Sequence, residues 1–281
     1  MARNGGFFSR LFRRTPLVPV VRFSGPIGIS LPLMSSMSLA SVSKQLDKAF
    51  GYRKAAAVAL VINSPGGAPT QSHLIYQRIR QLAEQKKKKV IVFVEDVAAS
   101  GGYMIACAGD EIVADTYSIV GSVGVVSASF GFEKLIKKLG IERRVYTAGA
   151  SKRQLDAFKP ERPEDVRRLK MLQTKIHEDF IALVKKSRGK RLNGTDKILF
   201  EGEYWLAEQA MKYGLIDAVG DLRSHLQKRF GKNVSTPLIA PPSGFFSRRI
   251  PGMSGAIMPD DLAKNALAAL EERALWGRYG L

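Results

Sequence analysis

A short apolar run that ends at small residues and a serine constrains the fold of this chain more than any other feature. The run is Val90 to Val94, and its β-branched and aromatic side chains predict a strand buried on both faces of a sheet. Ser100 follows, with glycines behind it that begin a helix, so it lies at the turn between strand and helix. A serine there is exposed beside the first amides of the helix and suits a nucleophile; capping the helix is the alternative role.

Two further segments repeat this order of strand and small-residue loop. A strand over residues 56–62 leads to Gly66 and Gly67, whose amides can face a bound atom as an oxyanion hole requires, although a plain turn has the same pattern. A strand over residues 111–114 precedes a loop in which Ser122 is placed to hydrogen-bond a neighbour. If the strands are parallel, right-handed crossovers bring these loops to one crevice at their carboxyl ends. We therefore predict an α/β fold with its site in that crevice.

Other segments of the chain predict more regular structure. Residues 17–23 form a strand that we expect at an edge of the sheet, because Pro19 weakens it. Residues 141–147 predict another strand, residues 163–188 a long helix, and residues 205–213 a shorter helix.

Changes in composition divide the chain into four parts. Residues 1–16 are a basic amphipathic N-terminal arm, and residues 17–231 are one catalytic domain. Residues 232–258 are rich in proline, glycine and serine and predict a linker. Residues 259–281 predict a C-terminal helix with one apolar side.

The charge balance points to an anionic partner. The chain has 44 Lys+Arg against 25 Asp+Glu, a formal net charge of +19. The basic residues are spread along the sequence without a nucleic-acid-binding motif, so we expect no nucleic acid and predict peripheral contact of the N-terminal arm with an anionic membrane. We find no apolar run of the roughly 18 residues that a transmembrane helix needs and no signal peptide, and expect a cytoplasmic or peripherally membrane-associated protein.

A nucleophilic serine needs a base. The three histidines, His73, His177 and His225, are expected to be exposed or packed residues of helices, and the one cysteine, Cys107, a buried small side chain. No metal-ligand spacing or phosphate-binding loop is present, so we expect neither metal nor cofactor. A lysine serves as base only when burial or a neighbouring cation keeps it neutral. Lys152 lies between small and apolar residues that suit this role; a solvated loop lysine is the alternative.

Four motifs together resemble the signal peptide peptidase A family of serine peptidases in order and spacing. They are Asn63-Ser64-Pro65-Gly66-Gly67, Ala99-Ser100-Gly101-Gly102-Tyr103, Gly121-Ser122-Val123-Gly124-Val125 and Gly149-Ala150-Ser151-Lys152. The resemblance covers residues 19–226. It implies the fold of Clp protease subunits and crotonases, a spiral of ββα units.

The resemblance also implies a serine endopeptidase with a Ser-Lys dyad, acting on signal-peptide-like or unfolded peptide segments. Ser100 would be the nucleophile and Lys152 the general base, with an oxyanion hole from the amides of Gly101 and of Gly67 or its neighbour Gly66. Ser122 would orient the lysine amine. Short members are implied to assemble as ring-like homo-oligomers in which adjacent protomers supply serine and lysine. Typical members begin with a transmembrane segment that this sequence does not show.

Two other functions remain open at this level. A crotonase-like acyl-CoA enzyme would use the same kind of oxyanion hole, but it leaves the pairing of Ser100 with Lys152 unexplained. A catalytically silent, membrane-associated scaffold would use the positive charge alone.

Overall fold

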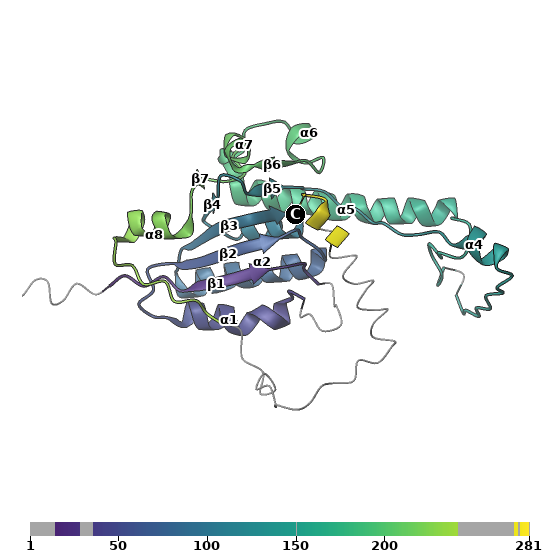
Figure 1. Cartoon of the computed structure of the whole chain (residues 1–281), viewed down its shortest axis with the longest axis horizontal. Coiled ribbons are helices and arrows are strands. Elements are labelled where there is room, and N and C mark those ends of the chain that lie inside the picture. The colour runs from purple at the N-terminus through teal and green to yellow at the C-terminus, as the bar shows by residue number, and fades with distance from the viewer. Residues whose placement is uncertain (1–14, 29–35, 150, 241–272, 275, 281) are drawn as a thin grey trace, which may run out of the picture.

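A single, mostly parallel sheet organises the molecule (Figure 1). The computed structural model describes residues 15–28, 36–149, 151–240, 273–274 and 276–280. The strands are β1 (Val20–Ser24), β2 (Val58–Ser64), β3 (Val90–Ala99), β4 (Glu111–Ala114), β5 (Ile119–Gly121), β6 (Tyr204–Leu206) and β7 (Ala218–Val219). The sheet order is β1-β2-β3-β4-β7, while β5 pairs with the end of β3 and with β6. These pairs are parallel except β5 with β6, which confirms the predicted α/β class.

Helices cover both faces of the sheet because its strands are apolar on both faces. The helices are α1 (Leu39–Gly51), α2 (Pro69–Lys86), α3 (Gly101–Ala106), α4 (Glu133–Lys138), α5 (Pro163–Arg188), α6 (Asp196–Leu199), α7 (Ala207–Lys212) and α8 (Leu222–Phe230), with one 3-10 turn at Gly189–Arg191. Leu60 of β2 packs in the core with α1, α2 and α3, whereas Val61 packs in the second core with α8. Successive strand residues thus bury on opposite faces, as the apolar run predicted.

The central strand is longer than predicted. We expected β3 to stop at Val94, but it continues to Ala99 because β5 pairs with residues 97–99 and provides a partner. Ser100 therefore directly follows Ala99, the last paired residue, and this pairing fixes the position of the Ser100 backbone.

The first strand lies at the sheet edge, as predicted, and a downstream segment runs beside it. The amide of Val18 donates to the carbonyl of Ser235 at 2.8 Å, and the amide of Ile239 donates to the carbonyl of Val20 at 2.8 Å. The first residues of the predicted linker therefore pack on the domain. The rest of that linker, nearly all of the N-terminal arm and most of the predicted C-terminal helix lie outside the described residues.

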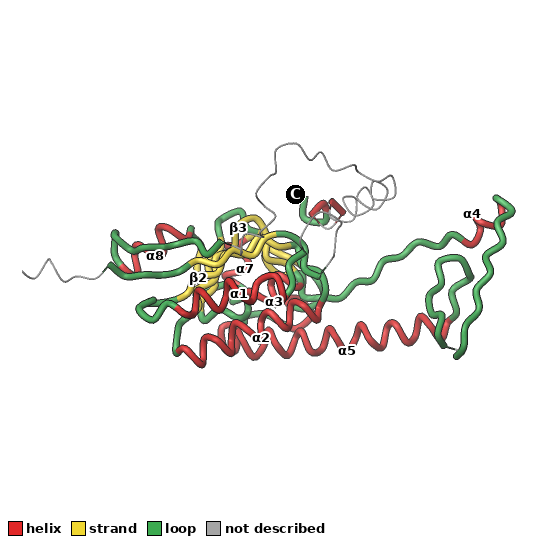
Figure 2. Tube along the Cα trace, turned by 90° about the horizontal axis from the view of Figure 1, so that it is seen from below, coloured by secondary structure: helices red, strands yellow, loops and turns green. Residues whose placement is uncertain are grey.

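After β5, the chain leaves the body of the molecule and returns along α5. Figure 2 shows α4 and the first half of α5 projecting away from the sheet. We call residues 127–149 and 151–175 the projecting arm. It exposes the large apolar side chains of Phe130, Phe132, Leu135, Leu139, Ile141, Val145, Tyr146, Met171 and Leu172.

Two predicted elements are wrong for reasons of tertiary structure. The predicted strand at residues 141–147 lies in the projecting arm, where no described residue pairs with it. The predicted helix at residues 205–213 begins only at Ala207, because Trp205 pairs with Val120 in β6. The segment 141–147 thus lacks the partner that a strand needs, whereas pairing with β5 places Trp205 in a strand although its local sequence favours a helix.

A buried ion pair ties α5 to the sheet. Arg188 has a fully buried side chain, and its guanidinium donates to both carboxylate oxygens of Asp217 at 2.8 and 2.9 Å. Asp217 also accepts from the amide of Ile112 at 2.8 Å. Burial alone would raise the pKa of Asp217, but the hydrogen bond and charge of Arg188 outweigh it, and the pKa is lowered.

We expect Asp217→Asn to destabilise the fold by about 3 kcal/mol, because it leaves a buried guanidinium without a counter-charge. Since the folded pKa lies below the unfolded value of about 3.9, the contribution is present above that pH and is lost as pH falls through the folded pKa. Urea unfolding at neutral and acidic pH measures the destabilisation and its dependence on pH. Asp179→Asn, in the exposed pair with Lys175, is the control and should change stability by less than about 1 kcal/mol. A gap between wild type and Asp217→Asn that stays constant on acidification would contradict the expectation.

Candidate active site

Ser100 occupies a strained turn between β3 and α3. Its φ and ψ are 51° and −120°, a conformation that costs a non-glycine residue of order 1–3 kcal/mol. Its amide donates to the carbonyl of Gly121 at 2.9 Å, and its carbonyl accepts from the amide of Met104 at 3.0 Å. Its side chain accepts no hydrogen bond from the described amides of α3, so it does not act as the helix cap. Ser100 is half-buried, and its hydroxyl makes no hydrogen bond with any residue that the structure describes, as a nucleophile requires.

The two glycines after β2 lie against this turn. A Cβ built on Gly66 would lie 2.9 Å from both the Cβ of Ser100 and the amide nitrogen of Gly101, and one on Gly101 would lie 3.3 Å from the amide nitrogen of Gly67. Gly101 begins α3, so its amide has no intrahelical acceptor. The amide of Gly67 donates no hydrogen bond within the described ranges. Two main-chain donors therefore lie close to the serine, in an arrangement that fits an oxyanion hole.

Ser122 lies beside Ser100 because their strands are in register. Ala99 of β3 pairs with Gly121 of β5, and each is followed by a serine. Ser122 also has a positive φ, 54°, and its amide donates to the carbonyl of Glu203 at 2.6 Å.

These residues face one cleft. It has a volume of about 700 Å³ and is lined by Pro65, Gly67, Pro69, Ser100, Ser122, Gly124, Val125, Val126, Glu201, Gly202, Tyr204, Arg278 and Tyr279. The structure thus brings together Ser100, Gly67 and Ser122, with Gly66 and Gly101 next to them.

Lys152 does not join this group within one chain. It lies on the exposed loop of the projecting arm between α4 and α5, and it is not among the residues that line the cleft. Its amine forms no hydrogen bond or ion pair with any other residue in the described part of the chain. Its role as a base therefore stays a prediction. It requires that the Lys152 amine of another copy, or of this chain in another arrangement of the arm, reach Ser100.

His177 has a positioning role that the sequence did not reveal. From α5, its Nε2 lies 3.1 Å from the carbonyl oxygen of Val123 and 2.6 Å from that of Phe200. Both carbonyls belong to loops that continue into the cleft lining. A ring N–H shared between them holds the two loops together. No spacing in the sequence links these three positions.

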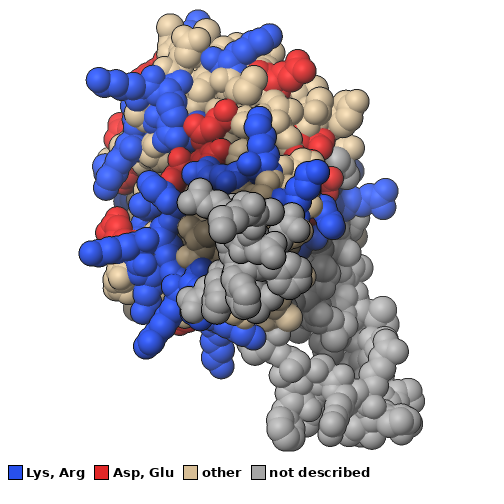
Figure 3. All heavy atoms as spheres, turned by 90° about the vertical axis from the view of Figure 1, so that its left-hand side faces the viewer, with Lys and Arg blue, Asp and Glu red and all other residues tan. Residues whose placement is uncertain are grey.

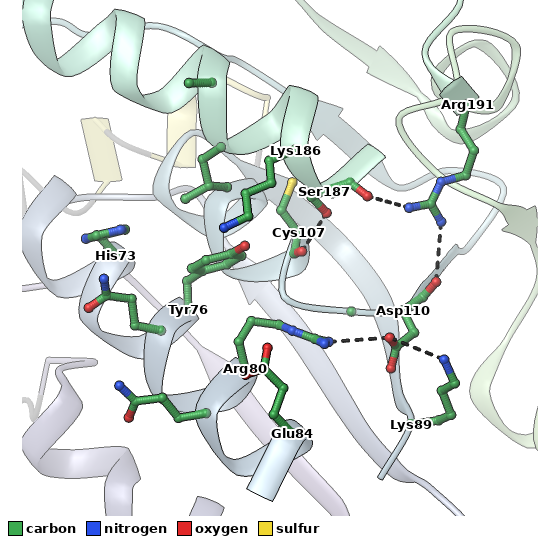
Figure 4. Close-up of a pocket in the computed structure, with 15 residues that line it drawn as sticks. His73, Tyr76, Arg80, Glu84, Lys89, Cys107, Asp110, Lys186, Ser187 and Arg191 are labelled. Atoms are coloured by element: carbon green, nitrogen blue, oxygen red, sulfur yellow. Dashed lines mark hydrogen bonds and ion pairs between the residues drawn. The ribbon is translucent and has the colours of Figure 1, made fainter. Parts of the chain in front are cut away.

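A second cavity, between α2 and α5, is bordered by a group of charged side chains. Figure 4 shows that Arg80 and Lys89 turn toward Asp110 there, and that Arg191 hydrogen-bonds to the same residue. Cys107 borders this cavity, but burial raises its pKa to about 12, so it stays a neutral thiol near neutral pH. This confirms that it is a buried small side chain. Among the described residues, no group of three or more His, Cys, Asp or Glu side chains is arranged to hold a metal ion.

Comparison with known proteins agrees with the geometry of the cleft. A sequence profile described as "Peptidase family S49" matches residues 82–232, more than half of the chain. The chain belongs to peptidase family S49. A Clp protease profile also matches residues 34–114, which agrees with the predicted Clp protease and crotonase-like fold.

Two curated relatives of this S49 chain show how much of a longer protein it matches. It is 54% identical over 274 residues to a protein named Na(+)/H(+) antiporter NhaA of Brucella abortus (strain 2308), covering 94% of the chain and 37% of that protein. It is 33% identical over 210 residues to the chloroplastic serine protease SPPA of Arabidopsis thaliana, covering 73% of the chain and 31% of that protein. The chain thus spans about a third of the length of these relatives.

A solved structure shares the fold. It is titled "1510-N membrane-bound stomatin-specific protease K138A mutant in complex with a substrate peptide", and it matches with a TM-score of 0.50 and 18% identity, covering 91% of this chain and 99% of that one. At that identity the likeness concerns the fold alone. None of the helices in the described ranges of the S49 chain has the length and apolar character for crossing a bilayer.

Proposed function

We propose that this chain is a serine endopeptidase that uses Ser100 to hydrolyse peptide bonds in unfolded or signal-peptide-like segments. The observation that carries the proposal is the strained turn at Ser100, which holds a hydroxyl without a hydrogen-bond partner among the described residues beside the amides of Gly67 and Gly101. Membership of family S49 and the naming of a relative as a serine protease support the same reaction.

The reaction follows from this geometry. The Ser100 hydroxyl attacks the carbonyl carbon of the scissile bond while a base takes its proton, and the carbonyl oxygen becomes an oxyanion that the two amides stabilise. The protonated base then gives its proton to the leaving amine, and an acyl-serine remains. Water, deprotonated by the same base, attacks the acyl group and releases the new carboxyl end together with Ser100.

The base is Lys152 of a neighbouring copy in a ring-like homo-oligomer. Two observations support this arrangement. Within one chain, Lys152 lies on the exposed loop of the projecting arm and away from the cleft. The same arm exposes many large apolar side chains, and apolar surfaces of this extent mark protein contacts. Packing the arm on a neighbour would bury that surface and remove water from the lysine, which favours the neutral amine.

The cleft suits an extended peptide. Its lining combines the apolar side chains of Pro65, Pro69, Val125 and Val126 with the hydroxyl groups of Ser100 and Ser122. The solved protease of the same fold is titled as a complex with a substrate peptide. Apolar, unfolded segments are therefore the substrate class that we propose.

The surface charge supports action close to a membrane. Figure 3 shows Lys and Arg side chains over much of the face on the side of α8, with fewer acidic ones between them. One relative is named as an antiporter, and the solved protease is titled as membrane-bound. We propose that the protein is cytoplasmic and contacts an anionic membrane peripherally through residues 1–16. Binding to anionic vesicles that survives high salt, or that survives removal of the first 15 or so residues, would contradict this.

A fluorophosphonate probe with intact-protein mass spectrometry tests the proposed nucleophile. We expect one adduct on the full chain, none on Ser100→Ala, and a retained adduct on Ser122→Ala. Tight binding of coenzyme A together with an unlabelled Ser100 would favour the acyl-CoA enzyme instead.

Gly67→Ala should lower hydrolysis by about 10²–10³-fold, the usual effect of losing one oxyanion donor. A Cβ at this position would lie 2.1 Å from the carbonyl oxygen of Ile27, so the Gly67 amide must move. Gly25→Ala is the matched control, because Gly25 also has a positive φ but has open space around its Cβ position. Initial rates on a fluorogenic unfolded substrate measure both variants. Equal losses in the two would show that backbone strain, and not the donor, is responsible.

A further inference from the structure

Two residues of a segment near the C-terminal end of the sequence lie in the cleft beside the proposed nucleophile. Arg278 and Tyr279 line the same cleft as Ser100 and Ser122. In Figure 1 the yellow C-terminal segment lies next to the end of β5. We call residues 276–280 the tail.

The tail is held by contacts with cleft residues. The ring of Tyr279 packs edge-on against the ring of Tyr204, with centroids 5.1 Å apart and planes at 75°. The Tyr204 hydroxyl donates to the carbonyl of Arg278 at 3.2 Å. Tyr204 belongs to β6 and pairs with Gly121 of β5, which in turn pairs with Ala99 just before Ser100. The tail is therefore anchored one strand away from β5, the neighbour of the nucleophile's strand.

The Tyr279 hydroxyl also lies near a residue of the proposed machinery. It lies in the same cleft as Ser122, whose side chain lowers the pKa of Tyr279, but burial outweighs this effect and raises that pKa, so Tyr279 stays a neutral phenol near neutral pH. Ser122 is the residue expected to orient the lysine base. While Tyr279 lies in the cleft with Ser122, the amine of Lys152 and a peptide substrate have to compete with it for that space.

We propose that the tail is a tethered occupant of the active-site cleft, which substrate must displace and which reveals a subsite for an aromatic residue preceded by arginine. This inference rests on the proposed peptidase function. Because the tail belongs to the same chain, its effective concentration at the cleft is on the order of millimolar, so modest affinity suffices to keep the cleft occupied.

Full-length Tyr279→Ala tests the proposal. It removes the ring contact with Tyr204 and the phenol from the cleft, and we expect KM for an unfolded fluorogenic substrate to fall on the order of tenfold, the effect of about 1.4 kcal/mol, with kcat unchanged. Tyr279→Phe keeps the ring and should give a smaller fall. Tyr117→Ala, which removes an exposed tyrosine outside the cleft, is the control and should leave KM unchanged.

A binding measurement separates this proposal from the peptidase function. A fluorescein-labelled peptide with the sequence of residues 273–281 is titrated with the full-length double variant Ser100→Ala, Tyr279→Ala, and its anisotropy is recorded. We expect saturable binding, a weaker response from the single variant Ser100→Ala, whose own tail competes, and none from a scrambled peptide. Equal binding by the two proteins, or no binding, would overturn the proposal.

The kinetic measurement can also overturn it. A KM that is the same with and without Tyr279 would do so. A change in KM that grows with protein concentration would do so as well, because tethering acts within one chain. Loss of hydrolysis in every form would refute the peptidase function and leave the anisotropy result valid.

Discussion

Ser100→Ala is expected to reduce peptide hydrolysis by about 10⁵-fold or more, because loss of the nucleophile alone removes nearly all of the rate in serine peptidases. The alanine has no atom that can form the acyl intermediate, while the amides of Gly67 and Gly101 stay in place. Residual turnover would come from the oxyanion hole and binding alone. Single-turnover assays with excess enzyme give the sensitivity that such a loss demands.

The fold itself should not change in Ser100→Ala. Alanine adopts the same positive φ at the same cost as serine, and the serine side chain makes no hydrogen bond with the described amides of α3. We therefore expect equal unfolding midpoints for the two proteins. Ser100→Gly should be inactive yet more stable by about 1 kcal/mol, since glycine relieves the strain of this conformation. A wild-type rate in Ser100→Ala would refute the proposed nucleophile, and destabilisation in Ser100→Gly would show that the turn carries no strain.

The sequence was sufficient to predict the parts of the fold in which local pattern and tertiary packing agree. Val90 to Val94 lie in β3 with both faces buried, and the helix from Pro163 to Arg188 has its predicted bounds. The meeting of Ser100, Gly67 and Ser122 in one cleft follows from parallel strands whose carboxyl ends lie together. Their chemical roles remain predictions, since position alone does not demonstrate chemistry.

Features that depend on contacts between distant segments could not be predicted from the sequence. Nothing near Tyr279 indicates that it packs against Tyr204, and nothing near His177 indicates the two carbonyls that it joins. The predicted strand around Val145 has a suitable composition but lies in the projecting arm, where no described strand pairs with it. Local preference decides secondary structure only where a tertiary partner supports it.

Lys152→Ala is the second variant for which we expect a very large effect, a loss of about 10⁴-fold or more, because the serine then lacks the base that takes its proton. Lys159→Ala is the matched control: this lysine is exposed on the same loop of the projecting arm, and its loss should leave the rate nearly unchanged. Equal rates for Lys152→Ala and wild type would refute the Ser-Lys dyad.

Mixing the two inactive proteins locates the base. If each site takes its serine from one copy and its lysine from the next, random assembly of equal amounts of Ser100→Ala and Lys152→Ala makes about a quarter of the sites complete, since each contribution is intact in half of the copies. About a quarter of the wild-type activity should therefore return after mixing and subunit exchange. The restored activity should fall on dilution as the oligomer dissociates, and it should not appear when Ser100→Ala is mixed with the double variant Ser100→Ala, Lys152→Ala.

Full inactivity of an exchanged mixture would place the dyad within one chain. The projecting arm would then have to fold back over its own cleft and bring Lys152 to Ser100, with its apolar side chains covered by the same body.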